Sequence, residues 1–280
     1  MSNLRIFTLT TLAMVAFAGN SLLCRAALQQ TSIDPASFTS IRLLSGALVL
    51  VLFVMMKEGR WTGEGGWFSA IALVVYAAGF SFAYVGLSAA TGALLLFGAV
   101  QVTMIGYGIW KGEQLRKTQM IGLLLASIGV IGLMLPGLSA PPLISSVLML
   151  SAGIAWGVYS LRGKGAGNPT AVTAGNFLRA VPIAFVLSAL TWNLTSLDAA
   201  GVMYAILSGA LASGVGYAIW YAALPGLKST SAAIVQLSVP VIAALGGVMM
   251  LGEPITLRLT LASVALLGGI ALVILEKKRC

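Results

Sequence analysis

The chain has 280 residues, of which 59% are hydrophobic and only 8% charged, and its mean hydropathy is +1.01. A soluble domain carries about 25% charged residues, so the chain has too few charges to cover a surface in water. The composition predicts an integral membrane protein and excludes a disordered chain, which needs low hydrophobicity and high charge. His is absent, and Cys24 and Cys280 lie near opposite ends of the chain. Because common metal ligands and catalytic bases are missing, we expect no metal, no cofactor and no enzymatic activity.

Ten apolar stretches follow one another along the chain, each close to the roughly 20 residues that a helix needs to span a bilayer. The connections between them are short and leave no room for a soluble domain. The predicted helices are Leu4–Cys24, Phe38–Met56, Trp67–Leu87, Ala93–Trp110, Met120–Leu135, Leu143–Leu161, Ala171–Trp192, Ala199–Leu224, Ala232–Leu251 and Leu257–Leu275. The sequence therefore predicts an all-α integral membrane protein with ten transmembrane helices.

Most basic residues fall on one side of the membrane when these helices are traced in order. Twelve of the 16 Lys and Arg residues lie at the termini or in the connections after the second, fourth, sixth and eighth helices. The opposite side holds only Arg25 and Arg258, and two further Arg residues fall within helices. Cytoplasmic loops are enriched in Lys and Arg, so we expect both termini in the cytoplasm. The net charge of +9 then reflects membrane orientation, and we expect no nucleic-acid partner.

The chain matches itself at an offset of about 134 to 140 residues. Asp34-Pro35 before the second helix recurs as Asn168-Pro169 before the seventh. Likewise, Gly112-Glu113 after the fourth helix recurs as Gly252-Glu253 after the ninth. Each half therefore contains five helices. Since this number is odd, the second half enters the membrane upside down relative to the first, an arrangement that recurs in secondary transporters.

The two repeats, residues 1–138 and 139–280, form one integrated transport unit in this interpretation. Ten helices in an inverted repeat, the Gly-Glu step and the Pro before the second and seventh helices resemble the drug/metabolite transporter superfamily of the EamA type. The resemblance covers essentially the whole chain, and the general likeness is greatest to bacterial YddG-like amino-acid exporters. Members often have Trp-Gly in the first and sixth helices; this chain has Trp156-Gly157 in the sixth but Phe17-Ala18-Gly19-Asn20 in the first. The resemblance implies alternating-access export of amino acids or related small metabolites across a bacterial inner membrane.

Polar and aromatic side chains inside the predicted helices are candidates for substrate binding, because polar groups are costly in a membrane and are often functional there. Trp156 and Tyr159 are three residues apart and Tyr217 and Tyr221 four apart, so each pair shares a helix face. Aromatic surface with hydrogen-bonding groups and little charge suits a small zwitterion with an apolar side chain. The predicted substrate-binding residues are Phe17, Asn20, Tyr76, Gln101, Trp156, Tyr159, Asn176, Arg179, Tyr217, Tyr221 and Gln236.

Several of these polar residues also have a structural interpretation. Asn20, Asn176 and Gln236 can hydrogen-bond a neighbouring helix without touching a substrate. Arg179, near the middle of its helix, can bind a substrate carboxylate, extend to the membrane surface or cap a backbone carbonyl. Arg42 is nearer the end of its helix, where we expect its side chain to snorkel to the interface.

Glycine and proline residues within the helices are candidate hinges, namely Gly108, Gly153, Gly157, Pro182 and Pro240. Glycines four residues apart also allow close helix packing, and the two prolines are expected to interrupt the seventh and ninth helices. The fifth and tenth helices have few polar groups and are typical of a scaffold or pairing surface.

None of the seven acidic residues lies in the middle of a predicted helix. Proton-coupled transporters commonly use buried Asp, Glu or His relays, so we predict no relay of membrane carboxylates. The sequence favours an exporter of aromatic or other apolar amino acids or related metabolites. A broader drug or sugar-phosphate carrier is the alternative, a channel or scaffold is compatible with the repeat, and the oligomeric state stays open.

Overall fold

The structure is a computed structural model that describes residues 3–59, 63–112, 114–137, 140–163, 167–227 and 235–276. Every regular element in these ranges is helical. Among the described residues, nine helices are long and apolar enough to cross a membrane, and a tenth apolar helix covers Ser238–Leu251. The expectation of an all-α membrane protein with ten helices is confirmed.

The first half contains α1 (Asn3–Gln30), α2 (Pro35–Glu58), α3 (Trp67–Tyr84), α4 (Ala89–Trp110) and α5 (Lys117–Met134). The second half begins with α6 (Leu143–Gly163), α7 (Pro169–Leu190) and the short helix η1 (Trp192–Leu194). The eighth span combines α8 (Ala199–Leu207), the π-helical segment η2 (Ser208–Val215), α9 (Gly216–Ala223) and the turn η3 (Leu224–Gly226). The last two helices are α11 (Ser238–Leu251) and α12 (Leu257–Glu276).

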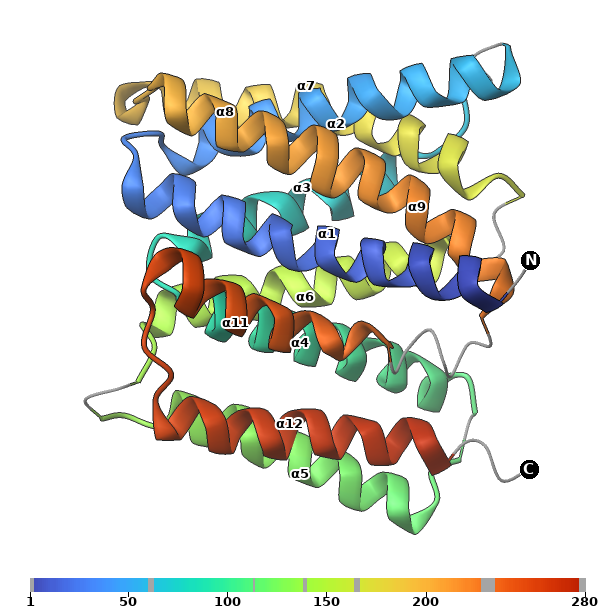
Figure 1. The fold of residues 1–280 in the computed structure, drawn as a ribbon, viewed down its shortest axis with the longest axis vertical. Helices are drawn as coiled ribbons and strands as arrows, with labels where there is room; N and C mark the ends of the chain where they lie inside the picture. Colours follow the sequence, from blue (N-terminus) through green and yellow to red (C-terminus); the bar gives the residue numbers. More distant parts are fainter. Residues whose placement is uncertain are drawn as a thin grey trace.

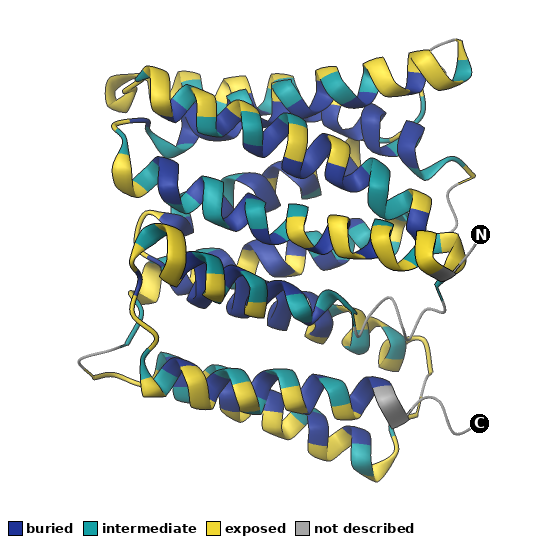
Figure 2. Ribbon diagram, viewed as in Figure 1, coloured by how far each residue is buried: buried dark blue, intermediate teal, exposed yellow. Residues whose placement is uncertain are grey.

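The helices lie side by side with their long axes roughly along one direction, and the start of α1 and the end of α12 lie at the same end of the bundle (Figure 1). Exposed residues follow the outward faces of the helices, whereas buried residues face their neighbours (Figure 2). Because many of the exposed residues are large and apolar, this outer surface suits lipid better than water.

Two equivalent caps fix the starts of α2 and α7. Asp34 Oδ1 accepts hydrogen bonds from the backbone N–H groups of Ala36 and Ser37, at 3.0 and 2.9 Å. Asn168 Oδ1 accepts from the N–H of Ala171 at 3.2 Å. In both helices a Pro follows the cap, where its missing N–H and fixed φ angle favour the first turn. The two capped starts lie at opposite ends of the bundle (Figure 1), as the inverted repeat predicts.

Two predicted helix features differ from the structure. The helix α1 continues beyond the expected end at Cys24 and contains Arg25. Pro182 lies inside an uninterrupted α7, so the expected break in the seventh helix is wrong. The ninth span is interrupted as expected, by a turn at Leu237, and Pro240 lies in the first turn of α11 that follows. A proline is tolerated in a first turn because the N–H that it lacks has no helical acceptor there.

The candidate hinge glycines on α6 are sites of close contact with α4. A Cβ atom placed on Gly153 would lie 2.5 Å from Ala99 Cβ and 2.6 Å from the Leu96 oxygen. On Gly157 it would lie 2.8 Å from Thr103 Cβ. Both glycines therefore serve helix packing in this conformation, and their role as hinges stays a prediction.

Elsewhere, α5 and α12 pack against each other at one edge of the bundle (Figure 1), in agreement with the expected pairing surface. The third candidate hinge glycine, Gly108, lies near the end of α4, and its hinge role likewise stays a prediction.

Candidate substrate-binding site

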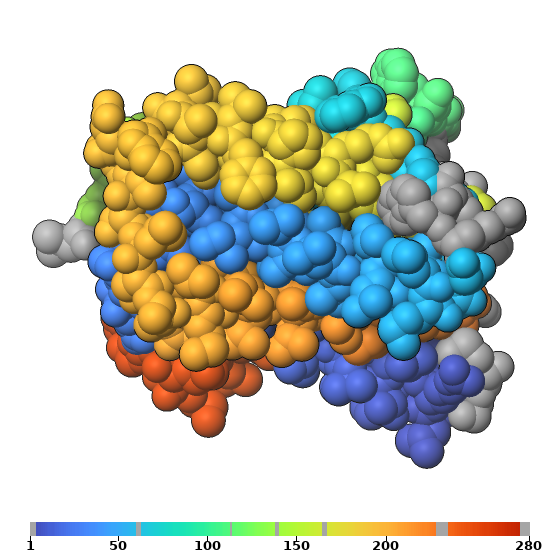
Figure 3. Space-filling view, turned by 90° about the horizontal axis from the view of Figure 1, so that it is seen from above, coloured from blue at the N-terminus to red at the C-terminus, as the bar shows by residue number. Residues whose placement is uncertain are grey.

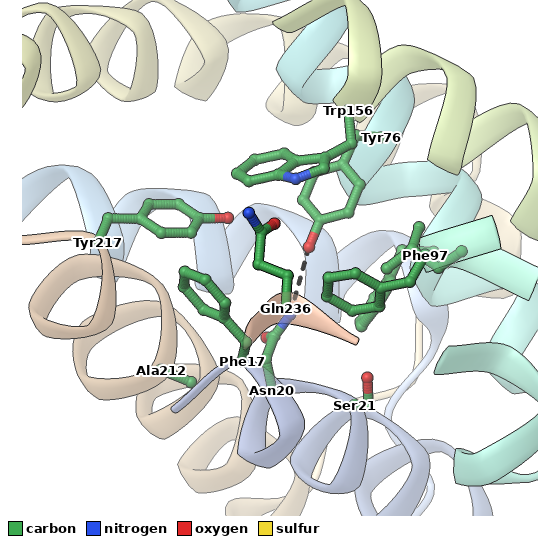
Figure 4. A pocket seen from close by; sticks show the side chains of 11 residues that line it. Phe17, Asn20, Ser21, Tyr76, Phe97, Trp156, Ala212, Tyr217 and Gln236 are labelled. Atoms are coloured by element: carbon green, nitrogen blue, oxygen red, sulfur yellow. Dashed lines mark hydrogen bonds between the residues drawn. The ribbon is translucent and has the colours of Figure 1, made fainter. Parts of the chain in front are cut away.

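A cavity of about 380 Å³, its opening included, lies between the two halves of the bundle (Figure 4). The lining side chains come from α1, α3, α4, α6, η2, α9 and the residue two positions before α11. They are Phe17, Asn20, Ser21, Tyr76, Phe80, Leu96, Phe97, Trp156, Ala212, Tyr217 and Gln236.

Aromatic rings form one wall of this cavity. The Trp156 ring stacks on Tyr217 with centroids 5.2 Å apart and on Tyr159 at the same distance. Tyr76 lies on the same indole at 4.7 Å, and Phe17 meets Tyr217 edge-on at 5.7 Å. Because these rings come from four different spans, the wall exists only in the folded bundle, and it offers a flat apolar surface to a ligand.

A chain of hydrogen bonds runs through two of the lining residues, Asn20 and Tyr76. The Ser208 hydroxyl donates to Asn20 Oδ1 at 2.6 Å. The Asn20 amide nitrogen in turn donates to the Tyr76 hydroxyl at 3.4 Å, the contact drawn in Figure 4. Arg42 Nη2 donates to the same hydroxyl at 3.0 Å. Two donors therefore converge on one oxygen at the cavity wall.

The expected snorkelling of Arg42 is wrong, because its side chain is only 1% exposed. Its guanidinium lies over the rings of Tyr76 and Phe80, 5.2 and 4.9 Å from their centroids. Its Nε donates to the Ser213 hydroxyl at 3.4 Å. Arg42 is the seventh residue after Pro35, about 10 Å along α2 at 1.5 Å per residue. Contacts from α3 and η2 keep the charge inside the bundle.

The π-helical segment η2 places two of these partners. Ser208 and Ser213 both belong to this segment, and Ala212 lines the cavity. Its backbone lies so close to α2 that a Cβ on Gly209 would be 2.0 Å from Ser45 Oγ and 2.1 Å from the Arg42 oxygen. π-helical turns are rare and often occur at functional sites, so the unusual geometry and the buried charge mark the same place.

Asn176 occupies on α7 the position that Arg42 occupies on α2, seven residues after the Pro at the helix start. Its amide nitrogen donates to the Tyr159 hydroxyl at 3.4 Å, and its Oδ1 accepts from the Gly66 N–H at 2.9 Å. The side chain is 2% exposed and joins the aromatic wall to the connection before α3. Bonding between elements, one of its two predicted roles, is therefore observed.

Arg179 is bound to backbone carbonyls. Its Nη1 donates to the oxygens of Glu64 and Gly175 at 2.7 and 3.0 Å, and its Nη2 donates to that of Gly63 at 2.9 Å. These bonds hold the connection between α2 and α3 against α7. Of the alternatives drawn from the sequence, carbonyl capping is the one seen, and contact of Arg179 with a substrate stays a prediction.

Six of the eleven predicted binding residues line the cavity. They are Phe17, Asn20, Tyr76, Trp156, Tyr217 and Gln236. Tyr159 lies behind Trp156, whereas Gln101 is buried on α4 outside the lining set and Tyr221 packs against the core. Contact with a substrate stays a prediction for all eleven residues.

Sequence reasoning missed five lining residues, which are Ser21, Phe80, Leu96, Phe97 and Ala212. It also missed Ser208 and Ser213. The spacing of Phe80, four residues after Tyr76 and so on the same helix face, could have predicted it. The two serines could have been found as polar residues within an apolar span. Leu96, Phe97 and Ala212 look like ordinary packing residues, and only the fold brings them together.

The acidic residue that is buried among the described residues, Glu253, has partners for its carboxylate. Glu253 lies in the connection between α11 and α12 and is 8% exposed. Its Oε1 lies 2.9 Å from Arg25 Nε, and its Oε2 accepts from the Ala89 N–H at 2.8 Å. None of the described residues that line the cavity is Asp or Glu.

Comparison with known proteins places this architecture in a family. The model of the EamA-like transporter family matches the chain twice, at residues 4–135 and 143–275. Each match covers one five-helix half. A solved crystal structure with 17% sequence identity superposes with a TM-score of 0.71 and covers 100% of both chains, which shows a shared fold.

Related proteins align with most of the chain. An uncharacterized protein of Pseudomonas aeruginosa is 57% identical over 98% of this chain and 96% of its own. A probable amino-acid metabolite efflux pump of Salmonella typhimurium is 24% identical over 94% of this chain and 92% of its own. The threonine/homoserine exporter RhtA of the same species is 28% identical over 78% of this chain and 74% of its own. Because the family model matches both halves, and the described residues form nine helices long and apolar enough to cross a membrane together with a tenth, shorter apolar helix, the chain belongs to the EamA-like transporter family and is a multi-pass membrane transporter.

Proposed function

We propose that the protein exports amino acids or closely related small metabolites across a bacterial inner membrane by alternating access. The observation that carries this proposal is the aromatic wall around Trp156, which lies between the two halves and combines apolar rings with amide and hydroxyl groups. Such a surface suits a small zwitterion with an apolar side chain. The names of two distant relatives, an amino-acid efflux pump and a threonine/homoserine exporter, support the same substrate class.

Alternating access follows from the repeat. Two inverted halves can exchange conformations, so that a site between them opens first to one side of the membrane and then to the other. The cavity draws residues from both halves, as this mechanism requires. An exporter must load its substrate from the cytoplasm, and the distribution of Lys and Arg supports a cytoplasmic location for both termini.

No relay of membrane carboxylates is part of the proposal. The described lining residues include no Asp or Glu, and buried Glu253 is held by Arg25. In this proposal the substrate moves down its own gradient, or a cation held by backbone carbonyls drives it without any carboxylate. Accumulation driven by an imposed pH gradient alone, in liposomes that contain the purified protein, would contradict this part of the proposal.

Counterflow in proteoliposomes tests the transport function. Liposomes are loaded with one of the twenty unlabelled amino acids, and entry of the same labelled amino acid is followed with and without the purified protein. A carrier gives trans-stimulated entry, whereas a channel or a scaffold gives none. If none of the twenty amino acids exchanges, amino-acid export is refuted.

A broader drug or sugar-phosphate carrier is the alternative function. A phosphate cargo favours several convergent cations, and Arg42 is the buried cation next to the cavity. The same counterflow assay with sugar phosphates and lipophilic amines separates the two substrate classes.

Orientation is tested in whole cells by a membrane-impermeant maleimide. Lys57→Cys, at the end of α2, and Leu257→Cys, at the start of α12, are made in a background without Cys24 and Cys280. We expect labelling of the second variant from outside and of the first only after permeabilisation. The opposite pattern would reverse the proposed topology.

A further inference from the structure

Arg42 carries a positive charge that no carboxylate among the described residues neutralises. An Arg side chain stays protonated in proteins, and this one is almost fully buried. The ionisable groups around it are Tyr76, Tyr217 and Cys24, and none of them carries a carboxyl group. Because a lone charge inside a membrane protein is costly, its retention here points to a function.

One of the three guanidinium nitrogens of Arg42 has no hydrogen-bond partner among the described residues. Nε donates to Ser213 and Nη2 donates to Tyr76. Nη1 is buried and has no hydrogen-bond partner among the residues that the structure describes. A buried charged donor without an acceptor loses its interaction with water and gains nothing in return. An acceptor that enters with a ligand would restore the balance.

Tyr76 links Arg42 to the cavity, because it accepts a hydrogen bond from Arg42 and also lines the cavity wall. Its oxygen accepts from Arg42 at 3.0 Å and from Asn20 at 3.4 Å, so its own O–H is directed away from both. The hydroxyl faces the space between Asn20, Trp156 and Gln236 (Figure 4). This end of the cavity therefore offers a hydrogen-bond donor backed by a full positive charge.

We infer that the carboxylate of the transported molecule binds at this end of the cavity, where it accepts a hydrogen bond from Tyr76 and serves as the counter-ion of Arg42. The apolar remainder of the molecule then lies against Trp156. This inference rests on the proposed function and names the substrate class as small monocarboxylates with an apolar or aromatic body. The carboxylate is required for binding, whereas the amino group is not.

Three probes that share a phenyl ring test this assignment. They are L-phenylalanine, 3-phenylpropionate, which lacks the amino group, and L-phenylalaninamide, which lacks the carboxylate. Each is added to the purified full-length protein, and the shift in thermal unfolding temperature and the apparent Kd are measured. We expect both acids to bind and the amide to bind at least about tenfold more weakly, since a hydrogen bond to a charged group is worth that factor or more.

Substitutions then assign the effect to Arg42. Arg42→Gln is expected to weaken both acids by about tenfold to a hundredfold and to leave binding of the amide unchanged. Without a ligand its unfolding temperature should equal or exceed that of the wild type, because a buried uncompensated charge has been removed. Tyr76→Phe, which keeps the ring, should weaken the acids and spare the amide.

Arg179→Gln is the matched control, because Arg179 also lies within a span but is bound to backbone carbonyls. It serves as a control for stability alone and should lower the unfolding temperature, because it removes the hydrogen bonds that hold the connection between α2 and α3 against α7. The inference is overturned if the amide binds as well as the acids, or if Arg42→Gln keeps the preference. It is also overturned if Arg42→Gln lowers the unliganded unfolding temperature as much as Arg179→Gln does, since Arg42 is then a structural residue. Arg42-dependent binding of the acids without counterflow supports the site and refutes the transport proposal.

Discussion

The Glu253 carboxylate lies 2.9 Å from Arg25 Nε, and this ion pair joins residues 228 positions apart in the chain. The two side chains are only 7% and 14% exposed. Glu253 also accepts from the Ala89 N–H, and Arg25 donates to the Tyr84 oxygen. The pair therefore ties α1 to the end of α3, the start of α4 and the connection after α11, at the end of the bundle opposite the termini (Figure 1).

Glu253→Gln should open this end of the bundle. Breaking a nearly buried ion pair leaves one charge unpaired, and a loss of about 1.4 kcal/mol already raises the open population about tenfold. Cys24 is adjacent to Arg25 and 0% exposed, so its thiol reports opening. In a Cys280→Ser background, labelling of Cys24 by a membrane-impermeant maleimide should be at least about tenfold faster in Glu253→Gln than in the parent.

Glu58→Gln is the control for that experiment. Glu58 accepts a hydrogen bond from the neutral Asn168 amide at the other end of the bundle, so this substitution breaks no ion pair near Cys24. Its labelling rate should match the parent. Equal rates in all three proteins would show that the Arg25–Glu253 pair does not hold this end closed.

Trp156→Ala should reduce counterflow about tenfold or more, because the indole is the ring that contacts Tyr76, Tyr159 and Tyr217. Removing it takes away the stacking surface and leaves a void. Trp156→Phe should retain most of the activity. Trp192→Ala is the matched control, because Trp192 is 73% exposed outside the bundle core, and its counterflow should be unchanged. Full activity of the Trp156→Ala protein would show that the aromatic wall does not bind the substrate.

On the face shown in Figure 3, segments of the first half (blue) lie against segments of the second half (yellow and orange). A helix therefore packs against residues far away in the sequence, and this limits which parts of the fold can be predicted. The number and order of the helices follow from hydropathy, since each span needs about 20 apolar residues whatever it packs against. The hydropathy pattern predicts that the first helix ends at Cys24, because the charged residue Arg25 follows. In the fold α1 continues, since Glu253 neutralises Arg25, and this partner is invisible to a local pattern.

The site was only partly predictable for the same reason. Aromatic and amide residues inside spans stand out in the sequence, and six of them line the cavity. The distance of Arg42 from a helix end favours a place at the membrane interface. In the fold its side chain stays inside the bundle, because it donates hydrogen bonds to Tyr76 and Ser213. The π-helical turn that supplies Ser213 has no sequence signal, because it depends on the close approach of Gly209 to α2.

Gly153→Ala should destabilise the protein by about 1 to 3 kcal/mol, the usual cost of forcing a methyl group into a packed interface. The new Cβ would lie 2.5 Å from Ala99 Cβ, so α6 and α4 must separate. Gly268→Ala on α12 meets nothing within 4 Å and should be neutral or stabilising by up to about 1 kcal/mol. Thermal unfolding of both purified variants measures the difference. Equal unfolding temperatures would argue that Gly153 is not a packing position.

Asn20→Asp places a carboxylate within reach of the hydroxyl that Arg42 and Asn20 share. The new Asp can still accept from Ser208, which donates to Asn20 at 2.6 Å, and it can accept from the Tyr76 O–H as well. It therefore supplies from within the chain the counter-ion that we assign to the substrate. We expect a higher unfolding temperature without a ligand, and binding of 3-phenylpropionate weakened at least tenfold.

Asn20→Ala separates this effect from simple loss of the amide. Ser208 is 0% exposed, and this substitution leaves its hydroxyl without an acceptor. The free energy of unfolding should therefore fall by about 1 to 3 kcal/mol. The two variants at position 20 should thus move the unfolding temperature in opposite directions. A destabilised Asn20→Asp protein that still binds 3-phenylpropionate would mean that the Arg42 charge does not reach the cavity wall, because an added carboxylate there would have found no cation to neutralise.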